Sequence, residues 1–288
     1  MNAVTPVLMY YNKDVFTKAG VEPPTTWSEL LAVIPKLKAA GVAPFALGGL
    51  EKWPELMWEE YLVDRIGGPG AFNAVMAGKA DSWSNAAFIK ANGMIQDLVK
   101  AGAFEDGFSS VSANSGQDVA LVYTGKAAML LQGAWVYPVF SQQSADFTKN
   151  SLGFMPFPAV DGGKGDPANV AGNPSSYFSI SSKATPAQKK TALAYLKNGL
   201  FDTTMVDSFI KEGQVPPVKG LEDKLGSGSD FTGWVYDLSQ KAPNFQMSWD
   251  QALSPAQATA LLTNLDQLFG MQITPKQFSD NMNKTIGQ

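Results

Sequence analysis

The sequence predicts an α/β fold, and three observations lead to this prediction. Short continuous apolar runs alternate with segments whose apolar residues recur at helical spacing. Glycine and proline separate these segments at most junctions. The chain of 288 residues, 45% of them hydrophobic and 17% charged, is long enough for a large core in one or two domains. We therefore expect buried strands and amphipathic helices in alternation.

The first half of the chain opens directly in a core element. Residues 7–11 (VLMYY) are an apolar run typical of a buried strand, and the helix that follows is expected to end at Gly20. Thr26 or Ser28 is expected to cap the next helix, with Gly41 as its stop. The predicted helices span residues 13–19, 28–40, 54–66, 85–101 and 115–125, and the predicted strands span residues 7–11, 43–47 and 127–131.

The second half begins with a segment rich in Gly, Pro and Asp, residues 153–173, where a crossover between two lobes is expected. A strand is predicted at residues 177–181, and GSGS at residues 226–229 is expected to be a flexible turn. Ser-Pro and Thr-Pro pairs are typical helix starts. The predicted helices here span residues 186–199, 203–212, 253–270 and 274–286.

Composition argues against several classes of function. The chain has no His and no Cys, so it lacks the usual general base, the commonest zinc ligands and the thiolate nucleophile, and no metal or cofactor is expected. A net charge of -4 and a single arginine, Arg65, argue against nucleic acid as a partner. No apolar stretch has the length of a membrane span, and residues 1–6 do not read as an export signal. A neutral or weakly polar ligand fits this balance better.

The tryptophans are the most informative side chains. Three of the turn-bounded segments that contain Trp present an aromatic ring where a ligand could meet it: Trp53 in a loop before a helix, Trp135 after the strand at residues 127–131, and Trp249 beside Asp250. The end of a strand is a favoured ligand position in open α/β sheets. Packing roles are expected for the remaining four, Trp27, Trp58, Trp83 and Trp234.

Four segments resemble, in the right order, the sugar-binding proteins of ABC importers, the family of maltose-binding protein. Residues 7–30 (VLMYYNKDVFTKAGVEPPTTWSEL) are similar to the family's "YNKdlfkkAGl-pPktWdEl" segment, and residues 123–138 (YTGKAAMLLQGAWVYP) to its "nGkaAM-i-GpW" segment. Residues 154–183, a Pro-rich loop followed by GNPSSYFSISSKA, and the QVPP turn at residues 214–217 also agree. The resemblance covers nearly the whole chain.

The resemblance implies a periplasmic-binding-protein-like (type II) fold with two lobes. Residues 1–178 and 225–288 would form the second lobe, and residues 179–224 would complete the first. Family members carry an export signal and the βα units of the first lobe before this point, so the sequence is expected to represent a chain with an incomplete first lobe and weakened binding. The implied location is extracellular or periplasmic, and the implied partners are a mono- or oligosaccharide and the membrane subunits of an ABC permease.

The expected ligand-binding residues follow from the chemistry of sugars and from the resemblance together. Aromatic rings cover the apolar C–H faces of a sugar, while carboxylates and amides meet its hydroxyls. The resemblance matches Trp135 to the family's "GpW" tryptophan and sets a carboxylate and an aromatic ring in the loop of Glu51 and Trp53. The complete expected set is Glu51, Trp53, Trp135, Asn173, Tyr177, Trp249 and Asp250.

Two other interpretations stay open. A carbohydrate-active enzyme would use two carboxylates from among Glu51, Glu55, Glu59 and Asp250, since a carboxylate pair is all that glycoside hydrolysis demands. An isolated interaction lobe would recruit another chain, including a second copy of itself, through residues 179–224. Turnover of a glycoside would support the first, and dimerisation in solution would support the second.

Overall fold

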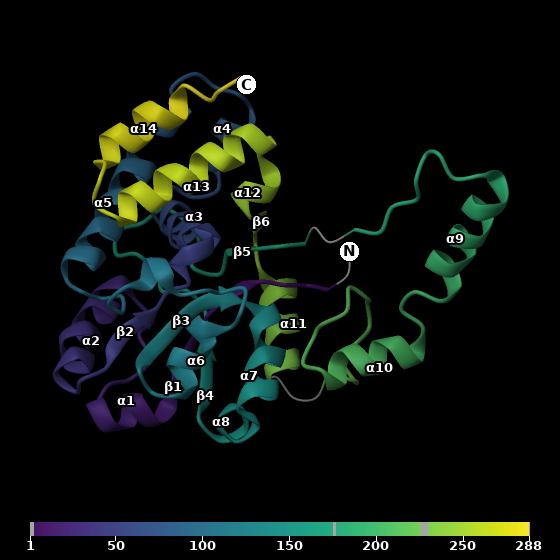
Figure 1. Cartoon of the computed structure of the whole chain (residues 1–288), viewed down its shortest axis with the longest axis horizontal. Coiled ribbons are helices and arrows are strands. Elements are labelled where there is room, and N and C mark those ends of the chain that lie inside the picture. The colour runs from purple at the N-terminus through teal and green to yellow at the C-terminus, as the bar shows by residue number, and fades with distance from the viewer. Residues whose placement is uncertain (1–2, 175–176, 226–229, 288) are drawn as a thin grey trace.

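The computed structural model describes residues 3–174, 177–225 and 230–287, which form a body and a projecting arm (Figure 1). The body contains a mixed sheet in the order β2-β3-β1-β4, in which β1 runs antiparallel to both of its neighbours and β2 runs parallel to β3. A second sheet pairs β5 with β6 in parallel. The strands are β1 (Val7–Asn12), β2 (Ala43–Ala46), β3 (Ala127–Gly133), β4 (Leu152–Met155), β5 (Val170–Gly172) and β6 (Phe245–Met247).

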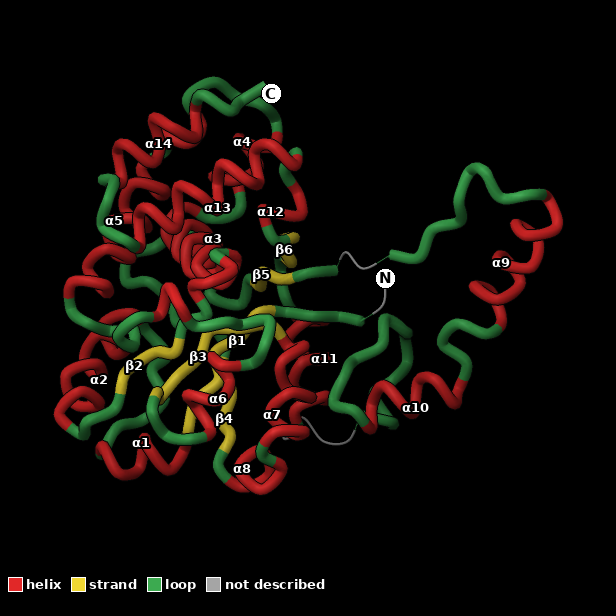
Figure 2. Tube along the Cα trace, in the orientation of Figure 1, coloured by secondary structure: helices red, strands yellow, loops and turns green. Residues whose placement is uncertain are grey.

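Helices surround these strands, as Figure 2 shows in red around yellow. In the first half they are α1 (Lys13–Ala19), α2 (Trp27–Ala39), α3 (Trp53–Gly67), α4 (Gly70–Met76), α5 (Ala86–Lys100), α6 (Gln117–Tyr123), α7 (Tyr137–Gln143) and α8 (Ala145–Asn150). In the second half they are α9 (Pro186–Asn198), α10 (Thr203–Lys211), α11 (Phe231–Lys241), α12 (Trp249–Ala252), α13 (Pro255–Phe269) and α14 (Pro275–Asn283). The described helices include none that is both long and apolar enough to cross a membrane.

The main sheet is buried on both faces, which explains its unbroken apolar strands. Along β1, Val7 and Met9 pack into one apolar cluster, whereas Leu8 and Tyr10 pack into another. This alternation follows from the two-residue repeat of a strand. Helices α2, α3, α5, α13 and α14 supply the first cluster, and α6, α7, α10 and α11 supply the second. A strand covered on both sides is therefore apolar at most positions.

Most predicted elements are confirmed, with ends shifted by a few residues. Gly20 closes α1 in the left-handed conformation at φ 63°. Thr26 caps α2 through a reciprocal pair of bonds with Glu29, and Ser254 and Thr274 cap α13 and α14 in the same way. The expected α/β fold is therefore correct.

The prediction of a strand at residues 177–181 is wrong. Residues 177–181 have no regular structure, none of the described strands pairs with them, and Tyr177 is 71% exposed. Five helices (α4, α7, α8, α11 and α12) and three strands (β4, β5 and β6) were not predicted. The turn expected at residues 226–229 lies outside the described residues.

The arm consists of α9 and α10 and extends to the right of the body in Figure 1. No side chain of α9 is buried, while α10 meets the body through Val206. Val206 joins the second apolar cluster together with Val215, Leu221 and Leu225. The division into a lobe of residues 1–178 and 225–288 and a segment 179–224 that completes another lobe stays a prediction.

Candidate functional site

A pocket of about 260 Å³ lies where α3, the turn after β3, the end of β5 and α12 meet. Seven residues line it: Trp53, Met57, Trp135, Asn173, Ser248, Asp250 and Gln251. Four of these are among the seven site residues expected from the sequence. Segments far apart along the chain thus bring two indole rings, two amides, a hydroxyl and a carboxylate to one place.

Trp135 is placed by the end of β3. The strand passes at Gly133 into a turn of 3-10 helix, Ala134–Val136, which carries the half-buried indole. A Cβ atom at Gly133 would overlap the indole ring, so only glycine lets the ring lie against the backbone here. The backbone covers one side of the ring, and the remaining surface is available to the pocket.

Trp53 is placed by the start of α3. The helix begins after Lys52, whose φ of 66° is unusual for a residue with a side chain, and Lys52 forms an ion pair of 2.9 Å with Asp266 on α13. The Trp53 ring lies 6.0 Å from the Trp135 ring, centroid to centroid, at an angle of 60°. Met57 lines the pocket one turn further along α3. The two rings therefore form adjacent, tilted walls.

Asn173 supplies an amide from the end of β5. Its backbone N–H donates to the carbonyl of Thr5 at 3.0 Å, and the Thr5 hydroxyl donates to the carbonyl of Asn173 at 2.6 Å. Its side-chain Oδ1 is buried and has no hydrogen-bond partner among the described residues. A buried amide oxygen without a partner is costly unless a donor reaches it. This acceptor is suited to a ligand hydroxyl.

The short helix α12 brings the remaining polar groups. Asp250 is half-buried, and the Nε2 of Gln251 donates to its Oδ2 at 3.2 Å. Asp250 is the one charged side chain among the described residues that line the pocket. Ser248 precedes α12 and is almost fully buried. The pocket therefore offers hydrogen-bonding groups and no cation.

Three expected site residues lie elsewhere. The Glu51 carboxylate accepts from the Ser112 hydroxyl at 2.6 Å and from the Ala113 N–H at 2.9 Å, so it holds a neighbouring loop. Tyr177 points to solvent and does not line the pocket. Trp249 is fully buried and stacks on Phe72 at 4.4 Å and 9°, which makes it a core residue in this arrangement. The expectation that the Trp249 ring contacts a ligand beside Asp250 is therefore corrected: the ring packs in the core.

Three lining residues were not expected. Met57 is four residues beyond Trp53, so helical spacing alone would have placed it on the same face. Ser248 and Gln251 flank the Trp249-Asp250 pair, but nothing in the sequence says which members of a four-residue helix turn toward the pocket and which toward the core.

Helix α3 also buries three glutamates. Burial raises the pKa of Glu55 to about 9, with a smaller upward contribution from Asp266 and a downward one from Lys52. Burial likewise raises the pKa of Glu59 and of Glu60 to about 8. Asn92 lowers the pKa of Glu59 in part, and Trp249 and Ser248 do so for Glu60. None of the three lines the pocket.

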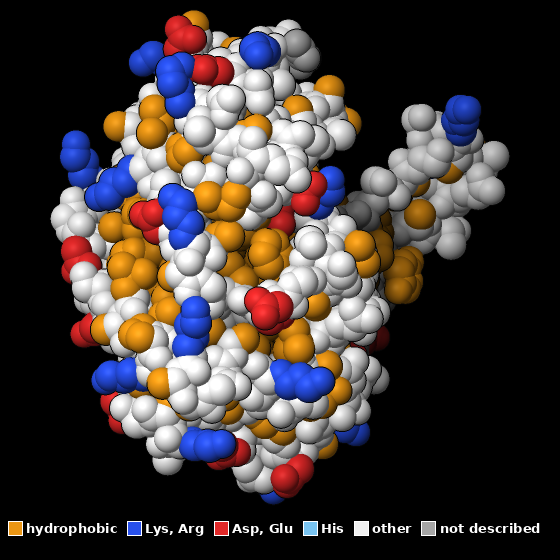
Figure 3. Space-filling view, turned by 60° about the vertical axis from the view of Figure 1, so that its left-hand side comes forward, with side chains coloured by type: hydrophobic (Ala, Val, Ile, Leu, Met, Phe, Trp, Pro, Cys, Tyr) orange, Lys and Arg blue, Asp and Glu red, His pale blue; other side chains and the backbone are white. Residues whose placement is uncertain are grey.

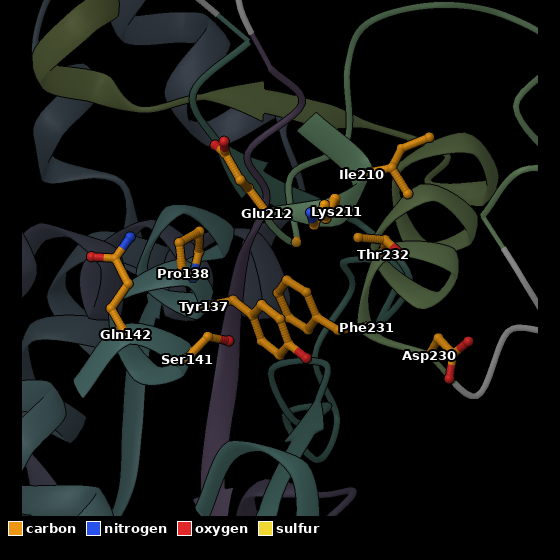
Figure 4. A pocket seen from close by; sticks show the side chains of 11 residues that line it. Tyr137, Pro138, Ser141, Gln142, Ile210, Lys211, Glu212, Asp230, Phe231 and Thr232 are labelled. Atoms are coloured by element: carbon orange, nitrogen blue, oxygen red, sulfur yellow. The ribbon is translucent and has the colours of Figure 1, made fainter. Parts of the chain in front are cut away.

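A wider groove of about 380 Å³ lies between α7, α10 and α11. Figure 4 shows the Tyr137 and Phe231 rings there, face to face. Their centroids are 3.9 Å apart at 4°, and Tyr137 also lies against Gly213, where a Cβ atom would overlap its ring. Because Phe231 covers one face of Tyr137 and Gly213 lies against the Cδ1–Cε1 edge, less of this ring is available to a ligand. The groove is a less suitable sugar site than the Trp53–Trp135 pocket.

The face of the molecule seen in Figure 3 carries no large patch of a single charge. Apolar side chains show near its middle, and Lys and Arg are interspersed with Asp and Glu around them. A hollow between α2 and α5 is lined by one cation, Lys90, and two carboxylates, Asp97 and Asp161, beside Trp27 and Met94. A face with mixed charges of this kind does not select a strongly charged partner.

The family model of the bacterial extracellular solute-binding proteins matches residues 1–202. The chain belongs to this family. It is 28% identical over 223 residues to the "Multiple sugar-binding protein" of Streptococcus mutans and 27% identical over 292 residues to the "Probable sugar-binding periplasmic protein" of Rhizobium meliloti. These alignments cover 75% and 96% of the chain. The resemblance found in the sequence is thereby confirmed.

The solved structure of a "Chitin oligosaccharide binding protein" has the same fold, with a TM-score of 0.87, 27% identity and 99% of this chain covered. It confirms the expected periplasmic-binding-protein-like (type II) fold. The chain covers 70% of that structure, and it spans 50% and 62% of the lengths of the Streptococcus and Rhizobium relatives. The chain thus corresponds to part of the length of its relatives.

Proposed function

We propose that this chain is a non-catalytic receptor for a neutral sugar or oligosaccharide. It would work outside the cytoplasm and deliver the sugar to the membrane subunits of an ABC importer. One observation carries the proposal: the tilted Trp53 and Trp135 rings share a pocket with the unpartnered Oδ1 of Asn173 and the carboxylate of Asp250. Aromatic surface and hydrogen-bonding groups are the two things that a sugar requires of a protein.

The charge of the pocket supports a neutral ligand. Asp250 is the charged residue among the described lining residues, so a phosphate or a uronic acid would meet a carboxylate and no cation to pair with it. The printed names of the relatives, "Multiple sugar-binding protein" and "Chitin oligosaccharide binding protein", are consistent with this class. Many neutral sugars share the apolar faces and hydroxyls that this pocket can bind.

The carboxylate arrangement argues against the carbohydrate-active enzyme. Hydrolysis needs two carboxyl groups about 5–10 Å apart across the scissile bond. Of the candidates, Glu55 and Glu59 are fully buried, and both oxygens of Glu51 accept hydrogen bonds from Ser112 and Ala113. This leaves Asp250 alone in the pocket. A receptor that binds without turnover is therefore the better account.

The proposal is tested by calorimetric titration with neutral mono- and oligosaccharides, chitin oligosaccharides among them, and with sn-glycerol 3-phosphate as the anionic probe. We expect saturable binding of a neutral sugar and no release of product from its aryl glycoside. Trp135→Ala should weaken binding at least tenfold, since ring stacking contributes roughly 1–3 kcal/mol in the analogous case of bases.

The matched control is Trp234→Ala, which removes a half-buried tryptophan of α11 that packs on the second apolar cluster and does not line the pocket. Its sugar affinity should be unchanged. Equal losses in both variants would make Trp135 a structural residue. Binding of glycerol phosphate in preference to every neutral sugar would overturn the proposed ligand class.

A further inference from the structure

Glu60 lies directly behind the pocket on the same face of α3 that lines it. Trp53, Met57 and Glu60 are spaced by four and three residues, which sets them in one row along the helix. Trp53 and Met57 reach the pocket, whereas Glu60 is fully buried one turn deeper. A carboxyl group in the interior has a large desolvation cost, so its contacts require an explanation.

Those contacts are with the start of α12. One oxygen, Oε1, accepts from the Ser248 hydroxyl at 2.7 Å and from the backbone N–H of Trp249 at 2.7 Å. The Ser248 side chain makes no capping bond to its own helix. The first N–H groups of a helix have no partner within it. Glu60 therefore supplies, from another helix, the acceptor that a capping side chain would otherwise provide.

Ser248 also connects to the third wall of the pocket. Its backbone N–H donates to the carbonyl of Gly172 at 2.9 Å, and Gly172 precedes Asn173. Asp250 and Gln251, which line the pocket, follow within the same short helix. The position of α12 relative to Trp53 is thus fixed at Ser248 by two polar contacts, one from α3 and one from β5.

We propose that Glu60 is a positioning residue for the pocket: by holding the first turn of α12 against α3, it sets Asp250 and Gln251 at the correct distance from the Trp53 ring. This inference rests on the proposed function. Loss of the carboxyl oxygen would leave a buried hydroxyl and a buried N–H without an acceptor, and α12 could recover partners only by shifting. Glu60 does not line the pocket, so its effect on a sugar would pass through α12.

Glu59 is the matched control. It is the neighbouring residue of α3, fully buried, and its pKa is raised to the same extent as that of Glu60. It lies beside Asn92 of α5 and makes no hydrogen bond to α12. Removing either carboxyl group changes the interior in a similar way, but only Glu60 should affect the pocket.

The test compares Glu60→Leu, Glu60→Gln and Glu59→Leu in the 288-residue chain, by titration with the neutral sugar that the unaltered protein binds best. Glu60→Leu should weaken binding at least tenfold. Glu60→Gln keeps an oxygen acceptor of the same shape and should stay within about threefold of the unaltered protein. Glu59→Leu should leave the affinity unchanged. Equal affinities of Glu60→Leu and Glu59→Leu would overturn the inference.

Amide hydrogen exchange at Trp249 gives a readout that needs no ligand. Glu60→Leu should accelerate exchange of this N–H at least tenfold relative to Glu60→Gln, and Glu59→Leu should not. If Glu60→Leu fails to fold, Glu60→Asp, which draws the acceptor back by one methylene, takes its place with the same expectation. A protein that binds no sugar would overturn the proposed function alone, whereas unchanged Trp249 exchange would overturn the role of Glu60.

Discussion

At the scale of single residues, the pocket depends on how closely one indole approaches the backbone. Gly133 ends β3 against the Trp135 ring, in a space that admits no Cβ atom. The position of the Trp135 ring therefore requires a glycine at position 133. This close approach allows Trp135 to stand beside Trp53 with part of its surface free.

Gly133→Ala should displace the Trp135 ring and weaken sugar binding at least tenfold while the fold is kept, because a rigid ring cannot yield to a new methyl group as a flexible chain would. Titration calorimetry measures the affinity, and circular dichroism checks the fold. The matched control is Gly93→Ala in α5, where a Cβ atom meets nothing within 4 Å. That control should bind normally and gain up to about 1 kcal/mol of stability. Normal binding by Gly133→Ala would contradict the account.

Sequence reasoning located part of the site because strand ends and helix starts are readable. Trp135 and Trp53 follow such boundaries, and both line the pocket. Trp249 follows β6, a strand that was not predicted, and its neighbours in the short α12 turn toward the pocket while its own ring turns into the core. Which side of a four-residue helix is buried depends on Phe72 and other distant residues, and no local pattern carries that information.

At the scale of elements, α3 is the element on which the site depends most. It carries Trp53 and Met57 at its first turns and also buries the acids Glu55, Glu59 and Glu60. An amphipathic pattern would expose such acids, but this helix is enclosed by α5, α12 and α13. The carboxyl groups are consequently held in surroundings that favour their neutral form.

Stability should fall as pH rises from about 5 to about 8. The native state raises the pKa of Glu59 and Glu60 from 4.5 to about 8, and that of Glu55 to about 9, so in this range it holds protons that the unfolded chain has lost. Each such group lowers the free energy of unfolding by at most about 1.4 kcal/mol per pH unit. Urea unfolding at several pH values measures the slope.

Glu59→Gln is the control for this slope, because it removes one titrating group and keeps the shape of the side chain. Its stability should depend less steeply on pH than that of the unaltered protein. A stability that is level or increases between pH 5 and pH 8 would show that these carboxyl groups are ionised and paired in the folded chain.

Capping chemistry explains only in part which helices could be predicted, since α3 and α6 were expected although they begin without a side-chain capping bond. Helices α2, α9, α13 and α14 begin with a side-chain cap and a reciprocal bond from a Glu or Gln three residues on, and all four were expected. Helices α4, α7, α8 and α11 begin without a side-chain capping bond, and none was expected. Their positions are set by tertiary packing, for which the local sequence gives no signal.

At the scale of the whole molecule, the body and the arm are stabilised differently. The described residues include nine exposed large apolar side chains, and four of them lie in or near the arm: Tyr177, Phe178, Leu193 and Tyr195. Such a concentration favours a further partner surface. The interaction-lobe alternative predicts self-association through residues 179–224, and a strictly monomeric species in sedimentation experiments would count against it.

Substitutions in the two arm helices should have unequal effects. Val206→Ala removes a buried side chain of α10 and should destabilise the chain by roughly 1–3 kcal/mol. Leu193→Ala changes a side chain of α9 that is 58% exposed and should alter stability by less than about 0.5 kcal/mol. Thermal unfolding compares them. A large loss in Leu193→Ala would mean that α9 is covered in solution.

The most direct test of the central claim is a crystal structure of this protein with the neutral oligosaccharide that binds best in titration. We predict a sugar ring against Trp135 and Trp53, with hydroxyls within hydrogen-bonding distance of Asn173 Oδ1 and the Asp250 carboxylate. A sugar bound instead in the groove of Tyr137 and Phe231, with the Trp53–Trp135 pocket unchanged, would contradict the account.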